Sequence, residues 1–181
     1  MEFVILFAVV AGIVIFVFSS AYSSIPFLPT NSRDLSTVIK KLHLKKDQVV
    51  IDMGAGSGTV IFAAASEAHK KGLSTEFIAI DINFLLVIFM WVRAWFHPHR
   101  NHITVMQGDL FKMDYERMIE PYQNILFYMY VSPWVTDRLA ELIQDTKKDC
   151  TLISYRYPVK KMKPEEITGG EHKLYSYKLG S

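Results

Sequence analysis

Residues 49–58 constrain the fold more than any other part of this 181-residue chain. The run from Val49 to Ile51 is short, apolar and β-branched, which is typical of a buried parallel strand. Three glycines follow at alternate positions, Gly54, Gly56 and Gly58. They permit a tight turn and a close backbone approach to a ligand. Thr59 to Lys71 then form a predicted helix whose first free N–H groups point toward the same place. Strand, glycine turn and helix together predict the nucleotide-binding corner of a doubly wound α/β sheet.

Asp52, two positions before the first glycine, indicates which ligand this corner takes. A dinucleotide site spaces its glycines G-x-G-x-x-G so that the pyrophosphate lies on the helix N-terminus, whereas the spacing here is D-x-G-x-G-x-G. A carboxylate repels a pyrophosphate by on the order of 1 kcal/mol at ~4–6 Å, but attracts a cationic amino acid. S-adenosylmethionine carries an ammonium and a sulfonium and no phosphate, so it fits the charge. A glycine-rich turn without a ligand is the structural alternative.

Two further aspartates follow predicted strands. Asp81 ends the strand Phe77–Asp81, about twenty residues after the glycine turn, where a carboxylate can accept both ribose hydroxyls. Asp109 follows the strand Ile103–Gln107, in the next loop of the same sheet edge, where it can accept the adenine amino group. A single aspartate is weak support, since Asp often ends strands and starts turns. The set of three predicts a nucleoside pocket.

The remaining chain alternates strands and helices without repeats. The predicted helices are 35–42, 59–71, 84–96 and 135–146, and the predicted strands are 49–51, 77–81, 103–107, 124–130 and 150–155. This rhythm predicts an α/β, Rossmann-like, doubly wound and mainly parallel sheet with helices on both faces. The tail after Pro158 has room for one more edge strand, His172 to Lys178, so we expect abridged C-terminal strands.

The N-terminal segment differs in kind. Phe3 to Phe18 is unbroken apolar sequence apart from Gly12, and with the next four residues it makes about 20 residues, enough for the ~30 Å hydrocarbon core. We expect a single transmembrane helix. A cleaved signal peptide is the alternative, but it normally begins with positive charge, and only Met1 and Glu2 precede this run. Basic residues follow the span: Arg33, Lys40, Lys41, Lys45 and Lys46. The positive-inside rule therefore places the globular domain in the cytoplasm, or on the matrix side in an organelle.

Composition narrows the remaining function classes. The formal net charge is only +2, and no basic stripe with interleaved aromatics is present, so we expect no nucleic-acid partner. The single cysteine, Cys150, excludes an internal disulfide, fits a reducing compartment and opens an apolar strand. His97-Pro98-His99 resembles a metal pair, but no cysteine or carboxylate cluster completes it, and we expect no metal.

The predicted helix 84–96 is apolar almost all round. Packing against the sheet and beneath a neighbouring element explains this composition most simply. The alternative is that Trp91, Trp95 and Phe96 touch the membrane interface or the anchor helix.

The glycine motif with Asp81 and Asp109 resembles the class I S-adenosylmethionine-dependent methyltransferases. A narrower resemblance covers nearly all of the chain. It is to the membrane-anchored protein-lysine methyltransferases that modify the ATP synthase c-subunit and the adenine nucleotide translocase, and to their prokaryotic relatives. The matching segments are Ile25–Thr30, Asp81–Asn83, Gly108–Phe111, Tyr130–Pro133 and Tyr155–Pro158. Two positions depart from the family pattern: Ser57 replaces an acidic residue, and Asp81 replaces a common Glu.

This resemblance divides the chain into an anchor at 1–22, a pre-methyltransferase segment with its helix at 23–47, and a cofactor-binding domain at 48–181. It implies that the proline-flanked segment at 25–30 covers the cofactor pocket; a simple linker is the alternative. About eight residues separate Phe18 from Pro26, at most ~28 Å when extended, so the pocket mouth lies close to the membrane. The expected cofactor-binding residues are Pro29, Thr30, Asp52, Gly54, Ala55, Gly56, Gly58, Asp81, Ile82, Asp109 and Leu110.

Methyl transfer to an amine needs a neutral nucleophile in line with the sulfonium, and mostly positioning. Tyr130, after the fourth strand, is the candidate catalytic residue, with an aromatic core role as the alternative. The sequence therefore predicts a membrane-anchored, S-adenosylmethionine-dependent enzyme that N-methylates lysine on a membrane protein near the bilayer surface. Two alternatives remain: methylation of a lipid or quinone-like molecule, and a non-catalytic assembly factor that binds the cofactor.

Overall fold

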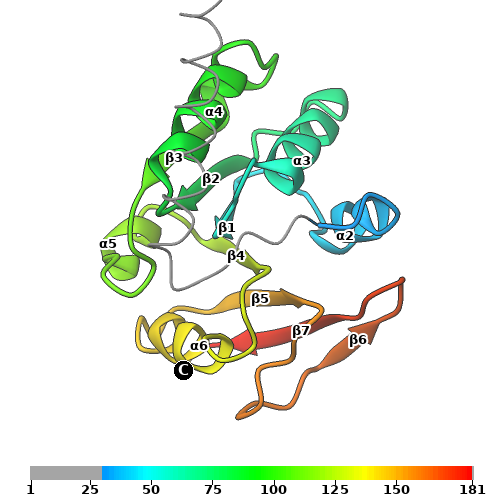
Figure 1. Ribbon diagram of the computed structural model, residues 1–181, viewed down its shortest axis with the longest axis vertical. Coiled ribbons are helices and arrows are strands. Elements are labelled where there is room, and N and C mark those ends of the chain that lie inside the picture. Colours follow the sequence, from blue (N-terminus) through cyan, green and yellow to red (C-terminus); the bar gives the residue numbers. More distant parts are fainter. Residues whose placement is uncertain (1–29, 181) are drawn as a thin grey trace, which may run out of the picture.

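The structure, a computed structural model, describes residues 30–180. These residues form a seven-stranded sheet in the order β3-β2-β1-β4-β5-β7-β6 (Figure 1). The strands are β1 (Gln48–Met53), β2 (Glu76–Asp81), β3 (Ile103–Gln107), β4 (Asn124–Met129), β5 (Cys150–Tyr155), β6 (Glu166–Thr168) and β7 (Leu174–Leu179). The first five strands run parallel to one another, β7 runs antiparallel to β5, and β6 runs antiparallel to β7.

Helices cover both faces of this sheet, as the sequence predicted. The helices are α2 (Leu35–Lys41), α3 (Thr59–Lys70), α4 (Phe84–Trp95), α5 (Tyr115–Ile119) and α6 (Thr136–Gln144), with a 3₁₀ turn at Arg100–His102. Every residue of β1 is buried, and its side chains alternate between two cores. Val50 packs with the side chains of α2, α3 and α4, whereas Ile51 packs with those of α5 and α6. β1 is therefore the middle of a doubly wound domain.

The expectation of abridged C-terminal strands is wrong. β7 lies inside the sheet between β5 and β6, and β6 rather than β7 is the edge strand. β6 has only three residues, which are exposed or half-buried, so it lacks the alternating apolar pattern by which strands are recognised. The chain after β5 is also fixed by a side chain of β7, since the Val159 N–H donates to the Tyr177 hydroxyl at 2.9 Å.

The sequence prediction also missed the short helix α5. Its five residues are too few for a helical period, and they are held by a cap in which the Arg117 N–H donates to the Asp114 carboxylate at 3.0 Å. Tyr115 and Ile119, four residues apart, are its buried side chains.

The predicted anchor at 1–22 and the residue Pro29 lie outside the described residues. Between residues 30 and 180, no helix is both long enough and apolar enough to cross a bilayer.

Candidate functional site

The loops that leave β1, β2 and β3 are joined at the C-terminal edge of the sheet. The N–H groups of Gly54 and Ala55 both donate to the Ile80 carbonyl, each at 2.9 Å. From the other side, the Gly108 N–H donates to the Asp81 carbonyl at 3.0 Å. The parallel register of these strands places their C-terminal ends together, so loops far apart in the sequence form one surface.

The glycine turn has the backbone conformation that its spacing predicts. Gly54, Gly56 and Gly58 have φ values of +80°, +58° and +75°, in the left-handed region. Gly58 also precedes the first residue of α3, and a Cβ there would lie 2.5 Å from a ring carbon of Phe62. A Cβ at Gly54 would lie 3.4 Å from Val131, in the loop after β4. The turn is therefore closely packed against both the helix and the fourth strand's loop.

Asp81 connects the glycine turn to the start of α4. One carboxylate oxygen accepts the Gly56 N–H at 2.7 Å, and the other accepts the Asn83 N–H at 2.8 Å. The Asn83 side chain in turn caps α4. Burial raises the pKa of Asp81, and the hydrogen bonds from backbone N–H groups partly offset that effect. The Ile82 N–H also donates to this carboxylate, which has about four lone-pair sites and so keeps room for one further donor.

Asp52 is the most buried of the predicted acidic residues, with 3% of its surface exposed. Burial and the nearby Asp81 carboxylate raise the pKa of Asp52 to about 8. Asp52 pairs in register with Tyr128 of β4, so the two side chains lie on the same face of the sheet. Thr30 approaches the buried Tyr128 hydroxyl, yet within residues 30–180 nothing meets hydrogen-bond geometry with that hydroxyl. A buried neutral carboxyl beside an unsatisfied hydroxyl is an arrangement that a polar, cationic ligand would stabilise.

Asp109 forms a tight turn after β3. One of its oxygens accepts the Phe111 N–H at 3.0 Å, and the other lies 3.6 Å from the Lys112 ammonium. Leu110 is buried, and its carbonyl accepts the Tyr115 hydroxyl at 2.7 Å. Ile82, after β2, is exposed at the same edge. The predicted nucleoside residues are therefore brought together, with Asp109 already engaged by its own loop.

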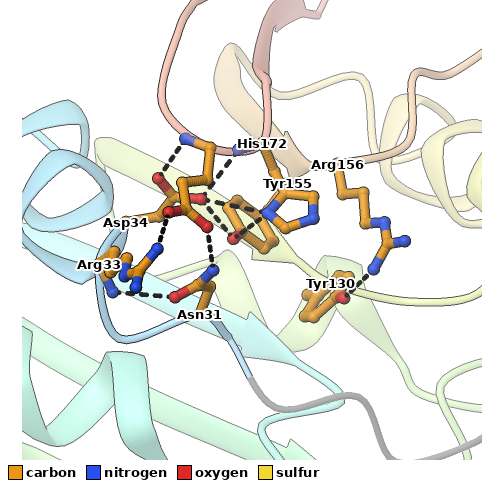
Figure 2. A network of polar contacts seen from close by, with 8 residues as sticks. Asn31, Arg33, Asp34, Tyr130, Tyr155, Arg156 and His172 are labelled. Carbon is orange, nitrogen blue, oxygen red and sulfur yellow. Dashed lines mark hydrogen bonds and ion pairs between the residues drawn. The ribbon is translucent and has the colours of Figure 1, made fainter.

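Tyr130 follows β4 on the same edge and lies in an aromatic group that includes Tyr155 and Tyr157. Its buried ring meets Tyr155 edge-on with centroids 4.8 Å apart, and Tyr157 in a stacked arrangement at 6.4 Å. The Tyr130 hydroxyl accepts a hydrogen bond from the Arg156 guanidinium at 3.2 Å (Figure 2). The contact with this hydroxyl raises the pKa of Arg156. The sequence indicated Arg156 only as part of a motif, and its contact with Tyr130 was not foreseen.

A buried carboxylate that the sequence did not indicate fixes the start of the described chain. Asp34 accepts the Tyr155 hydroxyl at 2.7 Å and the N–H groups of Glu171 and His172 at 2.7 and 2.9 Å (Figure 2). Burial raises the pKa of Asp34, but these hydrogen bonds outweigh burial and leave it lowered. Arg33 adds an ion pair to Glu171 at 2.6 Å. This network, which we call the Asp34 clamp, ties residues 31–34 to the end of β5 and to the β6–β7 turn.

The two histidines of the His97-Pro98-His99 segment have partners within the protein. His97 shares a hydrogen bond with Ser66 at 2.9 Å, and His99 lies 3.3 Å from the Thr75 carbonyl. Across the described range, no three metal-ligating side chains are grouped.

The strand order and the antiparallel β7, with the acidic and glycine loops at one sheet edge, define a Rossmann-like methyltransferase fold. Comparison with known proteins gives the family. The chain belongs to the ANTKMT methyltransferase domain family, whose model matches residues 52–166.

The chain is also similar to individual methyltransferases. The chain is 26% identical over 160 residues to a lysine N-methyltransferase of the ATP synthase c-subunit from Xenopus laevis, covering 87% of this chain and 65%, just under two thirds, of that protein. It is 20% identical over 166 residues to a protein-lysine N-methyltransferase of Saccharolobus islandicus, covering 86% and 94%. In fold it is similar to an RNA methyltransferase from Salinibacter ruber crystallised with S-adenosyl-L-homocysteine, with a TM-score of 0.68 at 18% identity, covering 84% of this chain and 94% of that one.

Proposed function

We propose that this chain is an S-adenosylmethionine-dependent methyltransferase that methylates a lysine side chain of a membrane protein. The observation that carries the proposal is the convergence of the glycine turn, Asp52 and Asp81 at one edge of the sheet. S-adenosylmethionine supplies an electrophilic methyl group when bound. The chain's own residues hold this cofactor and orient the amine.

The cofactor residues fit this ligand in charge and hydrogen bonding. The remaining acceptor capacity of Asp81 suits a ribose hydroxyl, and the left-handed φ values of Gly54, Gly56 and Gly58 let the turn, with Ala55, approach the ligand. Asp109, Ile82 and Leu110 are assigned to the adenine side, and Pro29 and Thr30 to the segment that covers the pocket. Asp52 is assigned to the cationic amino-acid end.

The high pKa of Asp52 gives this assignment a measurable consequence. With a pKa of about 8, most of the Asp52 carboxyl is protonated at neutral pH in the ligand-free protein. A cationic ligand stabilises the carboxylate, so binding at neutral pH releases a proton. Affinity should therefore rise as the pH is raised toward 8 and level off above it.

The surroundings of Tyr130 suit an amine acceptor. The Tyr130 hydroxyl accepts from Arg156 and keeps a second lone pair, which can accept an N–H of the lysine and so direct the nitrogen lone pair away from the ring. The positive charge of Arg156 disfavours a second cation nearby, and so favours the neutral amine that methyl transfer requires. The half-buried ring of Tyr157, stacked beside Tyr130, supplies a face that attracts the methylated ammonium product.

The membrane protein as acceptor is supported by the apolar sequence at 3–18, by the basic residues that follow it, and by the name of the Xenopus laevis relative. In this proposal residues 1–22 anchor the chain and the domain faces the cytoplasm, or the matrix in an organelle.

Incubation with methyl-labelled S-adenosylmethionine and native membranes tests the proposal. We expect label in a protein band, on lysine after hydrolysis, and no label with the Asp81→Ala variant. Label in the lipid extract would replace the lysine acceptor with a lipid or quinone-like one. Cofactor binding without label in any fraction would refute the enzyme and leave an assembly factor.

A further inference from the structure

The helix α4 exposes an apolar face along its whole length. Leu86, Val87 and Met90 are its buried residues, whereas α3, also twelve residues long, buries six. The exposed large apolar residues on and beside α4 are Ile82, Phe84, Ile88, Phe89, Trp91, Val92, Trp95 and Phe96. We call these eight residues the α4 face. A contiguous apolar surface of this kind on a folded domain marks a contact with a partner.

The charges around the α4 face indicate what that partner is. No Asp or Glu occurs from Ile82 to Gly108, and the charged or titratable residues in this stretch are Arg93, His97, His99, Arg100 and His102. The Arg93 guanidinium is turned inward, 2.6 Å from the Ser57 carbonyl and 4.2 Å from the centre of the Phe62 ring. Arg100, just beyond the helix, is exposed. His102 pairs with Glu76 of β2 at 2.6 Å, which is an acidic group from outside the stretch. A helix face rich in tryptophan and phenylalanine, with no acidic residue of its own and flanked by the exposed Arg100, matches the interface of a bilayer with anionic headgroups.

The α4 face is continuous with the edge of the sheet that carries the site. α4 begins three residues after Asp81, and the exposed Ile82 and Phe84 lie at this end of the face. Asn83, between them, caps the helix and donates its N–H to Asp81. Contact between the α4 face and a bilayer therefore brings the glycine turn and Asp81 to the level of the headgroups.

We propose that the α4 face is a bilayer-contact surface that holds the candidate active site against the membrane. This proposal rests on the proposed function only in naming a membrane-protein lysine as the acceptor, because the bilayer-contact surface is argued from α4 alone. Contact of the α4 face with lipid is consistent with a lysine acceptor at the headgroup level, since Asp81 and the glycine turn lie at the start of the same helix.

A fluorescent label on the 181-residue chain tests this surface. Cys150 is buried and is the sole cysteine, so a thiol-reactive label attaches selectively to a new cysteine at Trp95→Cys or, as matched control, at Ile167→Cys on β6. Both native side chains are exposed, at 71% and 52%, so neither change removes core packing. The labelled proteins are mixed with vesicles of phosphatidylcholine and phosphatidylserine, with and without brominated acyl chains.

We expect brominated lipid to quench the label at position 95 and to leave the label at position 167 bright. Two results would overturn the proposal: a label at 95 that aqueous iodide quenches as fully as the label at 167, or one that neither iodide nor bromine reaches, which would mean that protein covers the face. Flotation of the same vesicles reports anchoring separately, and methyl transfer in detergent reports the enzyme. Failure of the α4 face is thus distinguishable from failure of the proposed function.

A charge-introducing variant gives a second readout. The double variant Trp95→Glu and Phe96→Glu should lose methyl transfer to the acceptor in native membranes while keeping its melting temperature and cofactor affinity. Transfer at the wild-type level in this variant, with Ile167→Glu as control, would contradict the proposal.

Discussion

Replacing Asp52 by Asn should make the ligand-free protein more stable while weakening cofactor binding. The Asp52 side chain is buried, and burial with the nearby Asp81 charge raises its pKa from 3.8 to about 8. Between these two values the folded chain holds the proton and the unfolded chain releases it. Stability therefore falls as the pH rises through this window and levels off above about pH 8.

The size of this effect follows from the two pKa values. Each unit of pKa difference corresponds to about 1.4 kcal/mol, and pH 7 lies about three units above the pKa of the carboxyl in the unfolded chain. Ionisation of Asp52 therefore favours the unfolded chain by about 4 kcal/mol at pH 7 and by almost nothing at pH 4. Asparagine has the same shape and no such ionisation, so Asp52→Asn should raise the melting temperature by roughly 10 °C at pH 7 for a domain of this size.

Thermal or urea unfolding of the whole chain at pH 4, 5.5, 7 and 8.5 measures the stability difference between wild type and Asp52→Asn. Asp145→Asn, at an exposed position, is the matched control. The stability of the variant relative to wild type should increase with pH up to about 8, and titration with S-adenosylmethionine should show weaker binding without the proton release of the wild type. Equal stability of variant and wild type at pH 7, or parallel pH profiles, would refute the assignment of a buried, neutral carboxyl.

Three further substitutions test separate parts of the site. Tyr130→Phe should lower turnover about tenfold or more through lost orientation of the amine, while cofactor affinity stays near wild type; unchanged turnover removes the hydroxyl from the mechanism. Gly58→Ala should cost about 1–2 kcal/mol of unfolding free energy because of its left-handed φ, with further loss from the clash with Phe62; denaturant titration showing wild-type stability would contradict this. Asp34→Asn should lower stability by about 2 kcal/mol at pH 7 by breaking the Asp34 clamp. The folded pKa of Asp34 is lowered, so the stabilisation by its carboxylate is present above the ordinary pKa of 3.8 and is lost as the pH falls through the folded pKa. The melting temperatures of wild type and Asp34→Asn should therefore converge in acid. A difference in melting temperature that does not change with pH would count against the clamp.

The central sheet was predictable because local composition decides it. The strands Ile103–Gln107 and Cys150–Tyr155 have the same bounds in the structure as in the sequence prediction, since apolar runs between turn residues leave few alternatives. The glycine turn was equally predictable, because its conformation depends on residues within one short segment. β6 was not, since three exposed or half-buried residues become a strand only by pairing with β7.

In the candidate site too, local sequence patterns predict some residues, whereas other contacts depend on the tertiary structure. Asp52 and Asp81 could be proposed as site residues because each lies at the end of a predicted strand, and parallel strands end at one edge of the sheet. The Asp34 clamp joins residues 137 and 138 positions apart, and no local pattern marks such a contact. The partnership of Tyr130 with Arg156 likewise depends on how β4 and β5 pair, which sequence spacing alone does not give.

Cofactor binding by Asp81 variants tests the central claim most directly. Isothermal titration of S-adenosylmethionine into the whole chain should show binding by the wild type, weaker binding by Asp81→Asn, which keeps one acceptor oxygen, and no measurable binding by Asp81→Ala, with all three proteins folded by circular dichroism. Wild-type affinity in Asp81→Ala would show that the ligand lies elsewhere and would contradict the account of this sheet edge as the methyl-donor site.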